Sequence, residues 1–307
     1  MRTRFALLLA LATALPAAQA QIGKCPAKPV RVIVPFPAGG TVDIIARLLT
    51  PRLSHEFGQQ FIVDNRPGGG SSIGAEIAAR ANPDGSTVIV VASSYAANAT
   101  LYKLPYDPIT GIAPVTLITT GRFIVVVHPS VKATNLKEFI VLARAKPGTV
   151  NFGSPGNGSA PQLAIALFQQ MAKIEMVHIP YKGDAQVITD LLGGQIQFYV
   201  SSPLVLSPHI NAGKLRALAV TSEQRSPVMP DLPAVNELVP GYSAVNWFGM
   251  WAPLGTPKEI VSQLNQAIGR ILRQPDVRDR FESEGMETAH NTPEEFSRYL
   301  AQDIAKW

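Results

Sequence analysis

The chain has 307 residues, of which 46% are hydrophobic and 16% are charged. This length and composition favour a large core divided between two lobes, and they exclude an acidic disordered tail or a coiled coil. The formal net charge is +5, with 27 Lys and Arg against 22 Asp and Glu. The positive charges form no long run and no stripe interleaved with aromatic residues, so we expect no nucleic acid among the partners.

The N-terminal segment has the three parts of a secretory signal peptide in the usual order. Met1–Arg4 carries positive charge, Phe5–Leu15 is apolar and uncharged, and 18–20 is a small-x-small cleavage site. The apolar run is too short for a permanent membrane span. We therefore expect a signal peptide over 1–20 and a mature chain in the periplasm.

Short β-branched runs and amphipathic segments alternate along the rest of the chain. The expected strands are 30–34, 61–63, 87–92, 123–127, 150–152, 176–179, 196–200 and 215–220. The expected helices are 42–56, 72–81, 136–145, 161–172, 185–192, 257–273, 275–284 and 293–306. This alternation predicts an α/β fold with mainly parallel sheets flanked by helices.

A single open sheet does not comfortably hold this many strands, so we expect two lobes. Plausible crossings lie at 121–122 and within 241–247. They place 21–121 and 247–307 in lobe 1 and 122–246 in lobe 2. Two crossings between two α/β lobes create a hinge and a cleft.

Two glycine-rich loops each follow an expected strand and precede an expected helix. The first contains Phe36, Pro37, Ala38, Gly39, Gly40 and Thr41, and the second contains Ser154, Pro155, Gly156, Asn157, Gly158 and Ser159. Both lie at carboxyl ends of strands, where free N–H groups of the following helix favour an anion. Neither has a Lys, an Arg or a P-loop ending, so neutral donors indicate a carboxylate rather than a polyphosphate. Either loop alone is equally typical of an ordinary turn; the pair favours a ligand in the cleft.

Polar residues also follow other strands. Ser93, Tyr181, Lys182 and Ser201 can contact a ligand, or they can merely cap turns and face solvent. They complete the set of candidate ligand-binding residues that position alone suggests.

A third glycine-rich segment, 64–72, leads into a Gly-x-Ser-x-Gly match at 70–74, which is centred on Ser72. Residues 66–69 separate Ser72 from the preceding strand, so the sharp turn of a nucleophile elbow is missing. A secreted serine hydrolase is therefore a distant alternative. Cys25 is the only cysteine, which we expect to be a free thiol, and no zinc or dinucleotide motif is present. We expect no metal, no cofactor and no catalytic residue.

Six segments spread along the chain carry a family resemblance. They are 28–43 (KPVRVIVPFPAGGTVD), 63–70 (VDNRPGGG), 82–85 (NPDG), 181–183 (YKG), 190–195 (DLLGGQ) and 212–220 (AGKLRALAV). In combination they resemble the Bug family, the TctC-type extracytoplasmic solute receptors of tripartite tricarboxylate transporters. The resemblance covers essentially the whole mature chain. It implies a two-lobed fold like the type II periplasmic binding proteins (a Venus flytrap) and a receptor rather than an enzyme.

The resemblance also implies a ligand and partners. The ligand would be a small carboxylic acid, such as a dicarboxylate, a tricarboxylate or an aromatic acid. The partners would be membrane permease subunits, with a sensor kinase as the alternative. By position, the family's carboxylate contacts fall on both glycine-rich loops, on Asp43 and on ordered waters.

Two positions depart from the family pattern. Gln162, which we also expect to bind the ligand, stands where the family usually has a histidine, and Ser201-Ser202 stands where most members have Asp-Asn. The missing acid at Ser201 removes a partner for a ligand ammonium. We therefore expect a carboxylic acid without an amino group.

Overall fold

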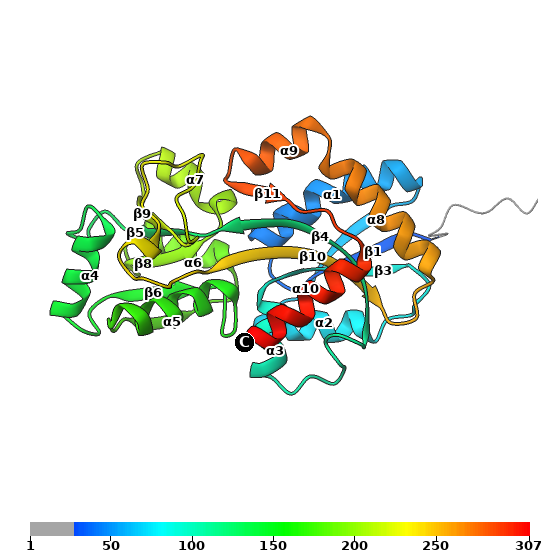
Figure 1. Ribbon diagram of the computed structural model, residues 1–307, viewed down its shortest axis with the longest axis horizontal. Coiled ribbons are helices and arrows are strands. Elements are labelled where there is room, and N and C mark those ends of the chain that lie inside the picture. Colours follow the sequence, from blue (N-terminus) through cyan, green and yellow to red (C-terminus); the bar gives the residue numbers. More distant parts are fainter. Residues whose placement is uncertain (1–27) are drawn as a thin grey trace, which may run out of the picture.

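The computed structural model describes residues 28–307. The predicted signal peptide and Cys25 lie outside the described residues. Two lobes lie side by side, each with its own sheet covered by helices (Figure 1). The two-lobed α/β fold expected from the sequence is therefore present.

Lobe 1 is built on a six-stranded sheet in the order β11-β4-β10-β3-β1-β2. Its strands are β1 (Val30–Val34), β2 (Phe61–Asn65), β3 (Thr87–Ala92), β4 (Ile112–Arg122), β10 (Val245–Pro253) and β11 (Met286–Thr288). Its helices are α1 (Thr41–Phe57), α2 (Ser72–Ala79), α3 (Ser94–Leu101), α8 (Lys258–Leu272), α9 (Pro275–Glu282) and α10 (Pro293–Lys306), with a short 3₁₀ turn η1 (Gly69–Ser71).

Lobe 2 is built on a five-stranded sheet in the order β7-β6-β8-β5-β9. Its strands are β5 (Ile124–Val127), β6 (Asn151–Ser154), β7 (Val177–Pro180), β8 (Phe198–Ser201) and β9 (Arg216–Val220). Its helices are α4 (Leu136–Ala145), α5 (Ala160–Ala172), α6 (Asp184–Leu192) and α7 (Pro203–Asn211), followed by a 3₁₀ turn η2 (Val235–Glu237).

Two long strands, β4 and β10, connect the lobes. They pair antiparallel from Val245 opposite Arg122 to Pro253 opposite Ile112, and both run between the lobes in Figure 1. Only Phe123 separates β4 from β5, so the chain passes directly from one sheet into the other. The lobe boundaries at 121/122 and 246/247 stay a prediction.

The sheets are mixed, which differs from the expected mainly parallel arrangement. Strands β1, β2 and β3 are parallel, whereas β10 returns from lobe 2 and pairs antiparallel with both β3 and β4. The sequence did not indicate β4, β10, β11, α3 or α7 as elements. Pro114 in β4 and Gly249 in β10 explain part of this, because proline and glycine weaken a strand pattern.

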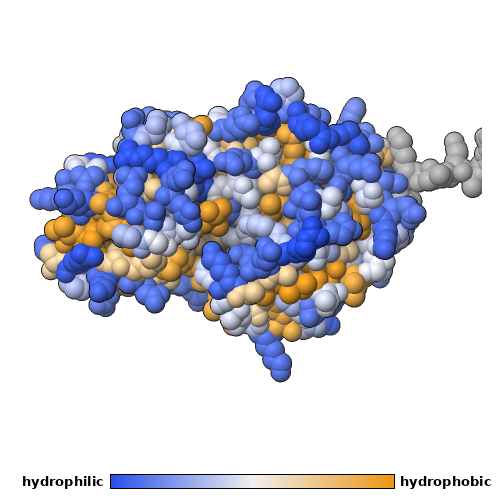
Figure 2. All heavy atoms as spheres, in the orientation of Figure 1, coloured by the Kyte–Doolittle hydropathy of each residue, from blue (hydrophilic) through white to orange (hydrophobic). Residues whose placement is uncertain are grey.

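The central strands of lobe 1 are buried on both faces. Val32 and Val34 pack with α1 on one face, whereas Ile33 packs with Trp251 and Phe296 on the other. This explains why β3 and the second half of β1 read as apolar runs rather than as alternating patterns. Within residues 28–307, no helix combines the length and the hydropathy that crossing a membrane requires. On the face in Figure 2, hydrophilic residues cover most of both lobes and apolar residues gather in a few patches.

Candidate functional site

The loop before α1 is held together by Asp43, in the first turn of that helix. Its carboxylate accepts hydrogen bonds from Gly39 N at 3.0 Å, Arg47 Nε at 2.9 Å and Asn65 Nδ2 at 2.9 Å. Asn65 Nδ2 also lies 2.9 Å from Phe36 O, which fixes the loop to the end of β2. These donors lower the pKa of Asp43, although burial opposes them. Asp43 therefore shapes the first loop with oxygens that are already paired.

The N-terminus of α1 is capped by an acid from the other lobe. Its N-cap, Gly40, has no side chain, and the carboxylate of Asp184 on α6 lies against the backbone N–H of Thr41 instead. A Cβ atom on Gly40 would lie 2.7 Å from Asp184 Oδ2, so glycine permits this close approach. The same region brings Gly183 against Pro37, where a Cβ would lie 2.9 Å from the proline ring.

Asp184 is fixed by lobe 2 as well. Its Oδ1 accepts a hydrogen bond from Ser201 Oγ at 2.9 Å and another from the Tyr199 hydroxyl. Burial raises the pKa of Asp184 above its ordinary value, although these donors and two backbone N–H groups favour the carboxylate. From the sequence we expected that Ser201, in place of the family's aspartate, leaves this corner without a carboxylate. The structure differs, because Asp184 on α6 supplies a carboxylate beside Ser201.

The loop before α5 is arranged differently. Ser154 Oγ lies 2.6 Å from His178 Nε2, and burial lowers the pKa of that imidazole, which favours its neutral form. Gly158 N donates to Gln162 Oε1 at 3.2 Å. No side chain caps α5, and the hydroxyl of its N-cap, Ser159, has no hydrogen-bond partner within residues 28–307. The donors at this helix N-terminus are left for another group.

An inner cavity of about 30 Å³ lies between the lobes at these two helix N-termini. Its lining residues are Phe36, Thr41, Val42, Ala92, Ser94, Phe123, Pro155, Ser159, Ala160, Pro161, Asp184, Ser201, Asn246 and Phe248. Asp184 is the one acidic or basic residue in this lining. Ser94, from the first turn of α3 in lobe 1, is also buried and has no hydrogen-bond partner in the described part of the chain. Two unpaired hydroxyls from opposite lobes thus share one cavity.

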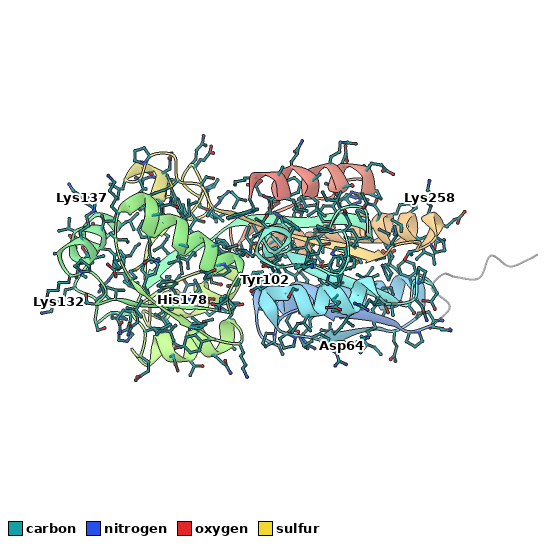
Figure 3. The ribbon with its side chains drawn as sticks, turned by 90° about the horizontal axis from the view of Figure 1, so that it is seen from below. Asp64, Tyr102, Lys132, Lys137, His178 and Lys258 are labelled. Atoms are coloured by element: carbon teal, nitrogen blue, oxygen red, sulfur yellow. The ribbon has the colours of Figure 1, made fainter. Side chains whose placement is uncertain are left out.

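A larger outer pocket of about 520 Å³ adjoins this cavity, and Phe36 and Pro155 line both. Its other lining residues are Pro37, Pro67, Gly68, Gly69, Gly70, Ser71, Tyr102, Gly156, Asn157, Pro180, Tyr181 and Lys182. Tyr102 lies where the lobes meet (Figure 3), and its hydroxyl donates to Asn157 O at 3.3 Å. The outer pocket is therefore formed by both lobes in contact.

The structure gathers most of the predicted site residues at this interface. Those lining the inner cavity are Phe36, Thr41, Pro155, Ser159 and Ser201. Those in the outer pocket are Pro37, Gly156, Asn157, Tyr181 and Lys182. Those that belong to the two loops or to the adjoining ends of β6, α1 and α5 but line neither pocket are Ala38, Gly39, Gly40, Asp43, Ser154, Gly158 and Gln162. Ser93 lies apart, in a crevice near the C-terminus, where its hydroxyl donates to Asn246 Oδ1 at 2.6 Å.

Several cleft residues were missed from the sequence, above all Asp184. Asp184 opens a helix after Gly183, which is typical of an ordinary acidic first turn. Ser94 follows a candidate serine at the end of β3, so its position gave a weak signal. No group of three or more potential metal-ligating side chains gathers anywhere in residues 28–307.

Two α/β lobes joined by two strands and closed on an internal cavity define a solute-binding protein of the periplasmic type. The family described as the tripartite tricarboxylate transporter family receptor, TctC, matches residues 45–307, and the chain belongs to this family. Its members are receptors rather than enzymes. The resemblance inferred from the sequence motifs is confirmed.

Individual members of this family are similar to the chain over most of its length. BugT of Bordetella pertussis is 34% identical over 97% of this chain and 92% of its own length. An R. palustris structure with adipate is 34% identical, covers 92% of this chain and 96% of its own, and has a TM-score of 0.88. MatC from Rhodopseudomonas palustris with bound malate is 30% identical, covers 92% of this chain and 98% of its own, and has a TM-score of 0.87.

Proposed function

We propose that this chain is a periplasmic receptor that captures a small carboxylic acid between its two lobes. The observation that carries this proposal is the pair of buried hydroxyls of Ser94 and Ser159, which lack partners within residues 28–307. Each residue is at most 1% exposed, and both line the inner cavity. Leaving a buried hydroxyl unpaired costs about 1–3 kcal/mol, so a ligand acceptor placed between them recovers that energy.

A carboxylate is the acceptor that this corner suits best. It would lie at the N-terminus of α5, where the helix dipole and the free N–H groups favour negative charge. Hydroxyl donors from Ser159 and Ser94 would add charge-assisted hydrogen bonds from the two lobes. Because these two donors lie on different lobes, one carboxylate would link them and favour the closed form.

The rest of the acid would extend toward the outer pocket, where Lys182 supplies a positive charge. The relatives solved with adipate and with malate support a dicarboxylic acid as the ligand class. Family membership supports membrane permease subunits as partners and uptake as the purpose. The signal-peptide pattern of residues 1–20 supports export to the periplasm.

The proposal is tested by a thermal-shift screen of the mature chain, refolded to remove bound ligand, against a panel of carboxylic acids. An acid at ~1,000 times its dissociation constant stabilises the folded state by ~4 kcal/mol. For a chain of this size, that raises the melting temperature by about 10 °C. Recovery of the acid unchanged, by mass spectrometry, would separate binding from turnover.

A matched pair of variants locates the binding. Ser94→Ala should weaken the best acid by roughly tenfold, because it removes one donor to a charged group. Ser207→Ala is the matched control, because it also removes a buried hydroxyl that is unpaired in the described chain. Ser207 lines neither pocket, so this variant should bind the acid as tightly as the wild type does. A panel without any binder, or equal losses in both variants, would contradict the proposal.

A further inference from the structure

One corner of the inner cavity presents a donor and an acceptor to each other across the two lobes. The donor is the backbone N–H of Thr41 in lobe 1, and the acceptor is the carboxylate of Asp184 in lobe 2. The two groups lie beside each other where the lobes meet. Asp184 Oδ2 is the oxygen turned toward α1, because it is the atom nearest to a Cβ built on Gly40.

Asp184 cannot easily turn away when a ligand enters. Its Oδ1 is bonded to Ser201 and Tyr199, and both partners come from β8 in its own lobe. Among these partners of Asp184, only Thr41 belongs to the other lobe, so opening of the lobes leaves the contacts with Ser201 and Tyr199 in place. The separated pair then offers a ligand one N–H donor on one side and one carboxylate acceptor on the other.

The chemistry of this corner selects among ligand groups. A hydroxyl accepts from the Thr41 N–H and donates to Asp184, so it satisfies both sides. A carboxylate accepts from Thr41 but meets a like charge at Asp184, whereas an ammonium pairs with Asp184 but cannot accept from the N–H. A hydrogen or a methyl leaves both groups buried and unpaired.

The corner also lies beside the donors that would hold the ligand carboxylate. Ser159 and Ser94 line the same small cavity as Thr41 and Asp184. All four residues line one cavity of about 30 Å³, so the carboxylate donors and the Asp184 corner belong to the same small space. The smallest ligand that reaches both Ser159 and Asp184 carries its hydroxyl on the carbon next to the carboxylate.

We propose that Asp184 is the specificity residue of this cleft and that, with the Thr41 N–H, it selects acids that carry a hydroxyl on the carbon next to the carboxylate. This inference rests on the proposed function, because it needs a carboxylate at Ser159. It assigns the ligand to the 2-hydroxy acids. It also accounts for the serine at position 201, where most family members have an aspartate. In this chain the carboxylate comes from Asp184, which accepts a 2.9 Å hydrogen bond from Ser201 Oγ.

The test uses matched acids that differ only in the group next to the carboxylate. Three series give this comparison at different sizes: lactate, alanine and propionate; malate, aspartate and succinate; and mandelate, phenylglycine and phenylacetate. Dissociation constants are measured by calorimetry in the series that the wild-type chain binds best. The hydroxy acid should bind the wild type about tenfold more tightly than its unsubstituted analogue.

Two variants then assign this preference to Asp184. Asp184→Ala should bring the hydroxy acid and its unsubstituted analogue to within about threefold of each other. Asp184→Asn keeps the size of the side chain and offers a weaker acceptor, so it should reduce the preference even if the alanine variant folds poorly. Asp276→Asn removes an acid from an exposed ion pair with Arg52 in lobe 1 and should keep the wild-type ratio.

The outcomes separate this inference from the proposed function. If the wild type binds acids without preferring the hydroxyl, or if the preference survives in both Asp184 variants, the inference is wrong and the carboxylate receptor stands. A wild-type preference for the amino acid over the hydroxy acid would also overturn it. If other carboxylic acids of the panel bind but no hydroxy acid of the three series does, this inference is wrong and the proposed function stands. If no acid of the whole panel binds, both fail.

Discussion

Helix α1 of lobe 1 and helix α5 of lobe 2 both begin at the cleft after a glycine-rich loop, but their first turns differ in their partners. Helix α1 is complete: Asp43 holds its loop, and Asp184 from the opposite lobe accepts the Thr41 N–H. Helix α5 begins at Ser159, whose hydroxyl is buried and unpaired within residues 28–307. The start of α1 is therefore already paired when the lobes are together, whereas the start of α5 keeps an unpaired donor.

This difference assigns separate tasks to the two helices. An N-cap contributes about 1 kcal/mol, and here α1 receives that contribution only when the lobes are together. The start of α1 therefore favours closure. The start of α5 keeps its donors for a ligand, and it gains its cap only when an acid is bound. Four substitutions test this division.

The largest effect is expected from Asp43→Ala, which dismantles the loop of α1 from within. Asp43 is 2% exposed, and its removal leaves the N–H of Gly39 and the amide of Asn65 without their acceptor. We expect a loss of about 3 kcal/mol in the free energy of unfolding, measured by urea denaturation. Asp279→Ala, on a side chain that is 65% exposed, should stay within about 0.5 kcal/mol of wild type. Equal effects would mean that Asp43 does not build the loop.

A smaller effect, on binding rather than on folding, is expected from Gly40→Ala. The added Cβ would lie 2.7 Å from Asp184 Oδ2, and Asp184 is held by two side chains of its own lobe. The lobes must close less tightly, so the best acid should bind roughly 30-fold more weakly, equivalent to about 2 kcal/mol.

Helix α6 offers the control for Gly40. Gly193 follows α6 with a φ of −81°, and a Cβ there meets nothing closer than 3.5 Å. Gly193→Ala should therefore leave the affinity unchanged. If Gly40→Ala binds the acid as tightly as Gly193→Ala does, the close approach of Gly40 and Asp184 is not needed for closure on a ligand.

On the α5 side, Ser159→Ala should change stability and affinity in opposite directions. Removing an unpaired buried hydroxyl should leave the ligand-free chain as stable as the wild type, or up to ~1 kcal/mol more stable. The same change removes a donor to the ligand carboxylate and should weaken binding by roughly tenfold. Urea denaturation without ligand and calorimetry with ligand measure the two effects. A variant that loses stability without ligand would show that Ser159 has a structural partner and is not waiting for a ligand.

The sequence predicted the part of this site that depends on local order along the chain. Strand, glycine-rich loop and helix follow one another at 30–57 and again at 151–172, and this order alone places both loops at carboxyl ends of strands. The facing of the two loops across a cleft followed from expecting two lobes. These features need no knowledge of which distant residues touch.

The rest of the site depends on contacts between the lobes, which local patterns do not encode. Asp184 sits in the first turn of α6, where an acid is common for the sake of the helix dipole alone. Its contacts with Thr41 and Ser201 follow from the closure of the lobes and from the position of β8. The hinge strand β10 was missed for a related reason: Gly249 interrupts its pattern because the ring of Phe296 occupies the space that a Cβ would need, with its nearest atom 2.3 Å away.

The smallest expected effect is a pH dependence of the free energy of unfolding that comes from Asp184, which faces the start of α1. Burial raises its pKa in the folded state above the value of 3.8 that it has when exposed. The folded state therefore binds this proton more tightly than the unfolded state, and Asp184 makes the free energy of unfolding fall as pH rises through the range between these two pKa values. Asp184→Asn has no proton to lose there.

The stability of Asp184→Asn relative to wild type should consequently improve as pH rises from about 4 to about 7. Urea denaturation of both proteins at several pH values gives this difference directly, and every group that the two chains share cancels from it. A difference that stays constant would mean that Asp184 keeps its ordinary pKa between the lobes, so that its hydrogen-bond donors fully offset the burial. In that case the cap of α1 would be an ordinary charged cap, and the two helix starts would differ only in where the capping carboxylate comes from.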